Sequence, residues 1–121
     1  MRCAIHQSEI VKKLANSSEP SIRYLCRRDV LGEDPAGEDM LALQEDIRNS
    51  DRVVKMLNQR GDDGRFPWHA YTKWIGAFWT LLLLTDIGYP AGDPSLVPLR
   101  DQVLEWLFSE QHLKKIPFIN G

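Results

Sequence analysis

The sequence predicts an all-α fold, and three observations support this prediction. Apolar residues recur at helical spacing along most of the chain, and no segment shows the two-residue alternation of a half-buried strand. Glycines follow several of these segments, at the position where helices commonly end. Residues 74–84 are apolar on nearly every side, as in a helix that is buried by its neighbours. We therefore expect antiparallel helical hairpins, stacked so that outer helices cover an inner one.

Composition limits the class of protein. The 121 residues predict a single domain (1–121), and 43% hydrophobic with 26% charged residues is typical of a soluble globular chain. Fifteen basic and seventeen acidic residues give a net charge of −2, which argues against a nucleic-acid partner. The uncharged stretch 74–85 is too short for a membrane span, and the start of the chain has no apolar run typical of a secretory signal. Two cysteines make no disulfide framework, so we expect a cytoplasmic protein.

The first half of the chain predicts four helices. A short helix covers residues 8–15, and a second runs from a cap at Ser18, with Pro20 in its first turn, to about residue 31, where Gly32 stops it. A third helix covers residues 38–48, and a fourth follows a cap at Ser50 and ends at Gly61. Their expected buried residues are Ile22, Leu25, Cys26 and Val30, then Met40, Leu43 and Ile47, then Val53, Val54 and Leu57.

The second half predicts two longer helices. The apolar one runs from about residue 70 to 87 and ends at Gly88, so Trp74, Phe78 and Trp79 should be largely buried. The last helix is capped by Ser95, with Pro98 in its first turn, and runs to about residue 109. Its buried stripe is Leu96, Leu99, Val103 and Leu107. Residues 111–121 show no sustained helical period and are expected to form an extended tail.

Several segments resemble one family. Gln59, Gly64 and Phe66 follow the spacing of the Gln-Trp motif of terpene cyclases, with Phe66 where that family usually has Trp. Residues 20–32 and 71–88 are similar to segments of bacterial squalene-cyclase-like proteins. The resemblance covers residues 19–109 and implies part of the α/α toroid that terpene cyclases share with protein prenyltransferases. A toroid cannot close with so few helices, so we expect an incomplete arc.

The chemistry of that family is not carried over with its fold. Its cyclases use an Asp-x-Asp-Asp motif, which this sequence lacks, and Asp62-Asp63 is its only adjacent Asp pair. Two carboxylates in a turn could hold Mg²⁺ with a diphosphate. Flanking glycines favour the simpler interpretation, a tight turn between helices, and we expect no cofactor.

A metal site is not expected either. The related prenyltransferases bind zinc through Asp, Cys and His. In this chain Cys3 and His6 have a spacing found in zinc sites but lack a second pair, and Cys26 falls on an apolar stripe. The candidate ligand-binding residues are therefore the Asp pair and the aromatic residues around the start of the apolar helix. They are Asp62, Asp63, Trp68, His69, Tyr71 and Trp74.

Three functions remain open. The first and favoured one is a helical-hairpin domain that is non-catalytic on its own, completed by self-association or by the rest of a longer chain. The second is a fragment of an isoprenoid cyclase or prenyltransferase-class enzyme, as the resemblance implies. The third is a helical-repeat module that binds a protein partner. No catalytic residue is assigned, because no Ser or Cys lies at a telling spacing from a His.

Overall fold

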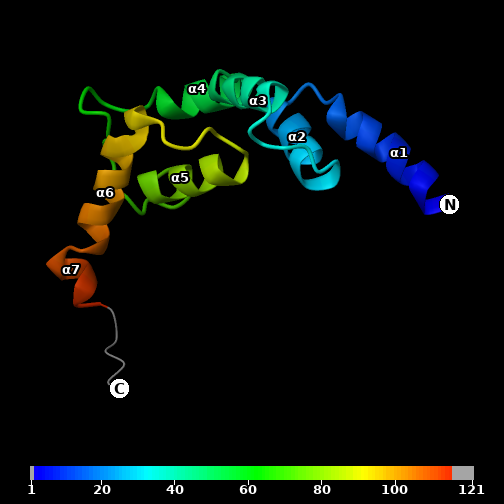
Figure 1. Ribbon diagram of the computed structural model, residues 1–121. Coiled ribbons are helices and arrows are strands. Elements are labelled where there is room, and N and C mark those ends of the chain that lie inside the picture. Colours follow the sequence, from blue (N-terminus) through cyan, green and yellow to red (C-terminus); the bar gives the residue numbers. More distant parts are fainter. Residues whose placement is uncertain (1, 116–121) are drawn as a thin grey trace. The chain divides into compact units, whose positions relative to one another are not determined.

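The computed structural model describes the backbone of residues 2–115 and the side chains of residues 9–115. Every regular element in this part of the chain is a helix, which confirms the predicted all-α class (Figure 1). The residues form two compact units. Unit 1 comprises the residues up to Leu57 together with Leu84–Gly92, and unit 2 comprises Asn58–Leu83 together with the residues from Asp93 on. The single domain over residues 1–121 stays a prediction.

The elements follow one another along the chain with short connections. In order they are α1 (Arg2–Ala15), α2 (Pro20–Leu25), the π-helix η1 (Cys26–Val30), α3 (Glu38–Arg48), α4 (Asp51–Leu57), α5 (Ala77–Asp86), the 3₁₀-helix η2 (Pro94–Leu96), α6 (Val97–Leu107) and α7 (Glu110–Leu113). Among the described residues, no helix is long and apolar enough to cross a membrane.

The start of unit 1 differs from the sequence prediction in three ways. Helix α1 begins at Arg2 rather than near residue 8. Glu19, not Ser18, is the N-cap of α2, with Pro20 in the first turn as expected. The chain then changes at Cys26 to the wider π-helix, in which the N–H of Leu31 donates to the carbonyl of Cys26 (3.1 Å). Gly32 follows with φ +66°, which confirms its role as the stop.

The change of helix type alters which side chains are buried. The sequence predicts that Ile22 and Val30 are buried together with Cys26, but both apolar side chains are exposed. Ile22 lies in α2, before the π-helix, so the change of helix type accounts for Val30 only. Tyr24, Cys26 and Ser21 are buried instead. A π-helix turn holds more residues than an α-helical turn, so the apolar stripe read at a period of 3.6 does not continue through η1.

Helix α3 has the bounds that the sequence predicts, and its stripe is buried as expected. Met40, Leu43 and Ile47 form much of the core of unit 1, where α3 packs mainly against α2. Helix α4 adds the buried Val53 and Leu57 but ends at Leu57 rather than at Gly61. Val54 is exposed, which corrects its predicted place in the core.

The segment after α5 completes the core of unit 1. Gly88 has φ +89°, and a Cβ atom there would lie 2.5 Å from Cδ2 of the buried Tyr24 ring. Its carbonyl accepts a hydrogen bond from the Gln44 side chain (3.2 Å). The neighbouring Tyr89 is buried, and its ring lies 5.7 Å from the guanidinium of Arg48. Gly88 therefore follows the end of the helix as predicted. Glycine is required there for two reasons, the positive φ angle and the close packing of the Tyr24 ring.

Unit 2 starts with a long connection, and this is where the prediction of a helix from residue 70 is wrong. Residues 70–76 are turns, and α5 begins only at Ala77. Trp74 has φ +71°, which a helix cannot contain, and its side chain is 69% exposed. Phe78 and Trp79 are partly buried, and Leu82 and Leu83 are exposed, so α5 is not covered on most sides.

Helix α6 contributes to the buried core of unit 2. Leu99 and Val103 are buried as predicted, and Leu96 and Leu107 are partly buried. The cap differs from the prediction, because Asp93 accepts a hydrogen bond from the N–H of Ser95 (2.9 Å) and starts η2 before α6 begins. Gln111–Leu113 belong to α7, not to an extended tail, and Ser109 caps this short helix. Residues 116–121 of the predicted tail lie outside the described residues.

Candidate functional site

An aromatic cluster in unit 2 has Trp106 of α6 at its centre. The Trp106 ring stacks on Tyr71, with ring centroids 5.0 Å apart and an interplanar angle of 29°. It meets the edges of His69 (5.7 Å) and Phe78 (6.3 Å), and His112 of α7 lies 4.7 Å away. One tryptophan thus joins the connection before α5, the start of α5, and helices α6 and α7.

A second group of rings continues the cluster along α5. Trp79 lies 5.6 Å from Tyr71, 5.4 Å from Phe78 and 4.9 Å from Trp74, measured between ring centroids. The ammonium of Lys73 lies 5.2 Å from the centroid of the Trp74 ring, within the range of a cation–π contact. The indole N–H of Trp79 is buried and has no acceptor among the described residues, so ring contacts rather than hydrogen bonds hold this side chain.

The backbone of residues 68–76 holds these rings in place. The N–H of Tyr71 donates to Nδ1 of His69 (3.0 Å), so that nitrogen is an acceptor and the proton of a neutral ring is on Nε2. The hydroxyl of Thr72 donates to the carbonyl of His69 (2.8 Å). The indole N–H of Trp68 donates to the carbonyl of Ile75 (2.8 Å), and this hydrogen bond links the beginning of the segment to its end.

Gly76 is the residue that lets this connection turn into α5. The N–H of Gly76 donates to the carbonyl of Thr72 (2.7 Å), and the N–H of Phe78 donates to the carbonyl of Ala70 (3.1 Å). A Cβ atom on Gly76 would overlap backbone atoms of Ala70 and Thr72, because its distance from the Ala70 carbonyl oxygen would be 2.4 Å. The fold around the cluster therefore requires a residue without a side chain here.

Helix α6 also fixes the preceding Gly-rich turn, through a glutamine that the sequence did not single out. The Gln102 side chain accepts from the N–H of Phe66 (3.1 Å) and donates to the carbonyls of Phe66 and Trp68 (3.0 Å each). Phe66 is buried and stacks on Trp68 at 5.1 Å. Gln59 of the Gln-Trp-like motif is exposed, so the contacts that hold the Phe66 segment come from Gln102.

A bidentate ion pair joins the same turn to α6. The Arg65 guanidinium bonds both carboxylate oxygens of Glu105, at 2.6 and 2.7 Å. These hydrogen bonds, and secondarily the opposite charge of the partner, hold the pKa of Glu105 below its ordinary value and raise the pKa of Arg65. Glu105 is therefore ionised at neutral pH and occupied by its partner, which makes it a weak general base.

The six candidate residues of the sequence separate into two groups. His69, Tyr71 and Trp74 belong to the connected rings, and Trp68 lies beside them on Phe66. Asp62 and Asp63 are exposed, and one Asp63 oxygen accepts from the N–H of Arg65 (3.0 Å), as in an ordinary Asx turn. Their role in binding a ligand stays a prediction.

The central residue of the cluster, Trp106, was missed by sequence reasoning. A signal for it does exist, because Trp106 follows Leu99 by seven residues and Val103 by three and so falls on the buried face of the same helix. Three of its ring partners, His69, Tyr71 and Phe78, lie more than twenty residues earlier in the sequence, and only the folded chain brings them to it. The fourth, His112, follows it by six residues.

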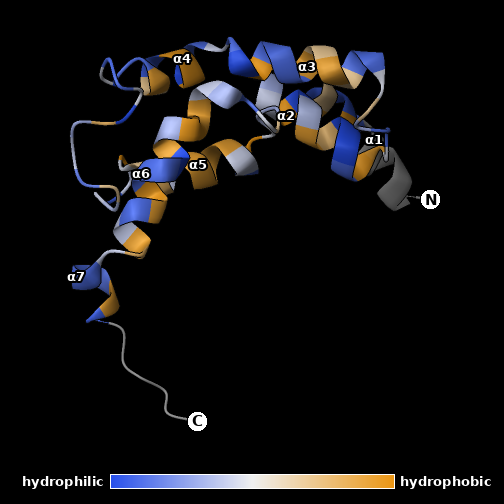
Figure 2. Cartoon of the chain, turned by 60° about the vertical axis from the view of Figure 1, so that its left-hand side comes forward, coloured by the Kyte–Doolittle hydropathy of each residue, from blue (hydrophilic) through white to orange (hydrophobic). Residues whose placement is uncertain are grey.

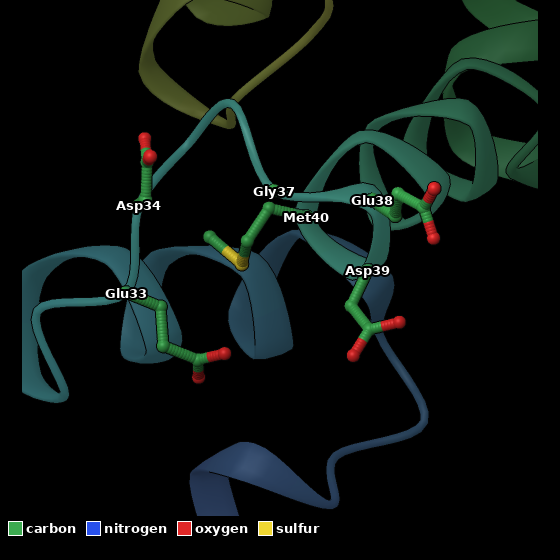
Figure 3. Close-up of a pocket in the computed structure, with 6 residues that line it drawn as sticks. All are labelled: Glu33, Asp34, Gly37, Glu38, Asp39 and Met40. Atoms are coloured by element: carbon green, nitrogen blue, oxygen red, sulfur yellow. The ribbon is translucent and has the colours of Figure 1, made fainter.

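A hollow in the described surface lies in unit 1, which contains none of the six candidates. It is an open depression of about 430 Å³ between η1 and α3, lined by Glu33, Asp34, Gly37, Glu38, Asp39 and Met40. Figure 3 shows the four carboxylates turned to different sides around Met40. Glu33 is already held by two hydrogen bonds from Arg27 (2.7 and 2.8 Å), which lower its pKa. The carboxylates therefore do not converge on one ion.

Metal ligands do not gather in the part of the chain that the structure describes: no three His, Cys, Asp or Glu side chains there could share an ion. Cys26 is buried in unit 1, as its place on an apolar stripe predicts, with its thiol 3.8 Å from the carbonyl of Val11. The side chains of Cys3 and His6 lie outside the described residues, so a metal at that pair stays untested.

Comparisons with protein-family models, with curated proteins and with solved structures find no match for this chain. The properties of the candidate site therefore follow from its own geometry.

Proposed function

We propose that this chain is a non-catalytic helical domain that binds a protein partner through an apolar surface of unit 2. That surface, called the α5 surface, consists of the exposed apolar side chains on α5 and on the turn before it. They are Tyr71, Trp74, Ile75, Leu82 and Leu83. Figure 2 shows the leucine-rich turns of α5 in the colour of strongly apolar residues.

The exposed Trp74 is the observation that carries this proposal. Trp74 is 69% exposed although tryptophan has the largest of the side chains and its ring is mostly apolar. Tryptophan and tyrosine are enriched at protein interfaces, where a few such anchors provide most of the binding energy. The Trp74 ring also contacts the Trp79 ring (4.9 Å between centroids), and the Lys73 ammonium lies 5.2 Å from its centroid. Contacts that restrict an exposed aromatic ring before binding lower the conformational entropy that it loses on binding.

The isoprenoid-cyclase alternative receives less support from the same rings. A carbocation needs aromatic faces that line a cavity closed to water. In this structure the rings lie on a surface where Tyr71 and Trp74 are exposed, and the hollow at Glu33–Met40 is acidic rather than aromatic. The strongly bonded carboxylates, Glu33 and Glu105, have lowered pKa values, which is the opposite of what a proton donor requires.

The resemblance to squalene-cyclase-like proteins enters this proposal as a matter of architecture only. We take the helices to form an incomplete arc of an α/α toroid, acting in the cytoplasm, whose uncovered edge is completed by another polypeptide. The positive φ of Gly64 (+79°) and the burial of Phe66 support a structural rather than a catalytic turn at these residues.

Site-specific photo-crosslinking in the cells that produce the protein tests the proposal. A photoreactive phenylalanine at Leu82, on the α5 surface, should give a crosslinked adduct of defined mass. The matched control is Leu41 on α3, which is similarly exposed (50% against 47% for Leu82) but lies in unit 1. A defined adduct at Leu82 and not at Leu41 supports the proposal. No adduct at Leu82, or the same adduct at both positions, refutes it.

A further inference from the structure

Helix α5 has an apolar stripe that runs its whole length. Trp79, Leu82 and Leu83 fall on one side of the helix, because they are three and four residues apart. Both leucines are exposed, whereas Ala77, Thr80 and Leu84 on the opposite side are buried. Trp74 and Ile75, just before the helix, add exposed apolar surface to the same end of the stripe. One face of α5 thus has partners within the chain and the other does not.

The two ends of this stripe carry opposite charges. No charged residue occurs from position 74 to position 85. Lys73 precedes the stretch, and Asp86 ends α5 on the stripe side, three and four residues after Leu83 and Leu82. Among the described residues neither Lys73 nor Asp86 has an ion-pair partner, and the Lys73 ammonium lies near the Trp74 ring. The stripe is therefore an apolar strip with a positive end and a negative end.

We propose that the partner on the α5 surface is a second copy of this chain, with the two α5 helices packed antiparallel about a two-fold axis. This inference rests on the proposed function and names its partner. In a two-fold pair, every contact across the interface occurs twice: if residue i of the first chain contacts residue j of the second, residue j of the first also contacts residue i of the second. Lys73 of each chain then faces Asp86 of the other. The midpoint between positions 73 and 86 falls at Trp79 and Thr80, so the axis passes beside the Trp79 ring.

Charge complementarity distinguishes this arrangement from other occupants. A parallel pair would place Lys73 against Lys73 and Asp86 against Asp86, which is unfavourable at both ends. The antiparallel pair makes both ends favourable, aligns the two helix dipoles in opposite senses, and covers Leu82 and Leu83 with the Trp74 end of the other copy. A partner of one charge sign would find one favourable end only. The stripe is thus self-complementary.

Sedimentation equilibrium of the purified chain over a wide range of concentration tests this pairing. The expected result is a reversible monomer–dimer equilibrium. Leu82→Glu should raise the dissociation constant roughly tenfold or more, because it buries an unpaired charge. Leu41→Glu is the matched control and should leave the constant unchanged. Both positions are exposed, and thermal unfolding followed by circular dichroism should show that both variants are folded.

Exchange of the end charges gives the decisive comparison. Lys73→Glu and Asp86→Lys should each weaken the dimer about fivefold, because each change introduces two repulsive pairs at exposed positions. A mixture of the two variants should form a heterodimer as tightly as the unaltered chain, since both ends then have opposite charges again. Rescue between two separate chains cannot arise from a change in the fold of either one.

The outcomes separate this inference from the proposed function. A chain that stays monomeric at every concentration, or a mixture that shows no rescue, overturns antiparallel self-association. If the crosslink at Leu82 then joins a different protein, the proposed interaction domain stands and only the identity of its partner was wrong. If the crosslink joins nothing, both fail. A self-crosslink with charge rescue supports both.

Discussion

Replacing Gly88 with alanine should lower the free energy of unfolding by about 2–5 kcal/mol, for two separate reasons. The backbone at Gly88 has φ +89°, and a left-handed conformation costs an L-residue roughly 1–2 kcal/mol. The new methyl group would also lie 2.5 and 2.8 Å from ring carbons of Tyr24, closer than non-bonded carbons can approach. Tyr24 is buried, so its ring cannot turn aside freely, and overpacking a core costs about 1–3 kcal/mol.

Gly92 provides a matched control for the backbone part of this cost. It has φ +78°, but a Cβ atom there would meet no other atom within 4 Å. Gly92→Ala should therefore show only the conformational cost of roughly 1–2 kcal/mol. The excess at Gly88 measures the contact with Tyr24, and in a Tyr24→Ala background this excess should disappear.

Urea unfolding followed by circular dichroism measures these differences, since the free energy of unfolding falls linearly with denaturant. Equal losses for Gly88→Ala and Gly92→Ala would show that Tyr24 does not pack on Gly88, and the description of the unit 1 core would then be wrong. An excess that persists without the Tyr24 ring would contradict the reasoning in the same way.

Two further predictions concern the turn that α6 holds in unit 2. Gln102→Ala removes three hydrogen bonds to the Phe66 segment and should cost about 2 kcal/mol, whereas Gln59→Ala at an exposed position should change stability by no more than about 0.5 kcal/mol. If urea unfolding shows equal losses of stability for Gln102→Ala and Gln59→Ala, Gln102 is not the main residue that holds this turn. Arg65 lowers the pKa of Glu105, so this pair contributes stability above the ordinary glutamate pKa of about 4.3 and loses it as the pH falls through the lower, folded value. The stability gap between the unaltered chain and Glu105→Gln should therefore close on acidification, and a gap that widens at low pH would contradict the assignment.

Sequence patterns predicted the elements whose structure is set locally. Helix α3 has its predicted bounds, because an amphipathic stripe and a turn on either side suffice to define it. Gly32, Gly64 and Gly88 have the positive φ angles expected of glycines that end helices or form tight turns. In each case the deciding interactions lie within a few residues of the chain.

The errors arose from two sources, local backbone geometry that apolar spacing does not encode and contacts between distant residues. Residues 70–76 contain no proline, yet they form turns in which Gly76 lies against the Ala70 backbone. The π-helix at Cys26–Val30 shifts the buried face of its segment. The spacing of apolar residues in the sequence does not predict such a change of helix type. Gln102 and Trp106 act on residues more than thirty positions earlier, so their roles could not be derived from the spacing around them.

The absence of charge from residue 74 to residue 85 predicts an inner helix only if two conditions hold. The side chains must be covered, and the residues that cover them must belong to the same chain. A long uncharged stretch indicates that the side chains are covered when the protein works, because exposed apolar area of this kind is costly in water. It does not say which polypeptide covers them. The buried side of α5, at Ala77, Thr80 and Leu84, is covered within the chain, and the side with Leu82 and Leu83 is not. In the arrangement that we propose, the same sequence signal has two causes on two faces of one helix, a core and an interface. In the proposed pair, Lys73 and Asp86 lie at the two ends of the exposed stripe, where each can meet the opposite charge of the other copy.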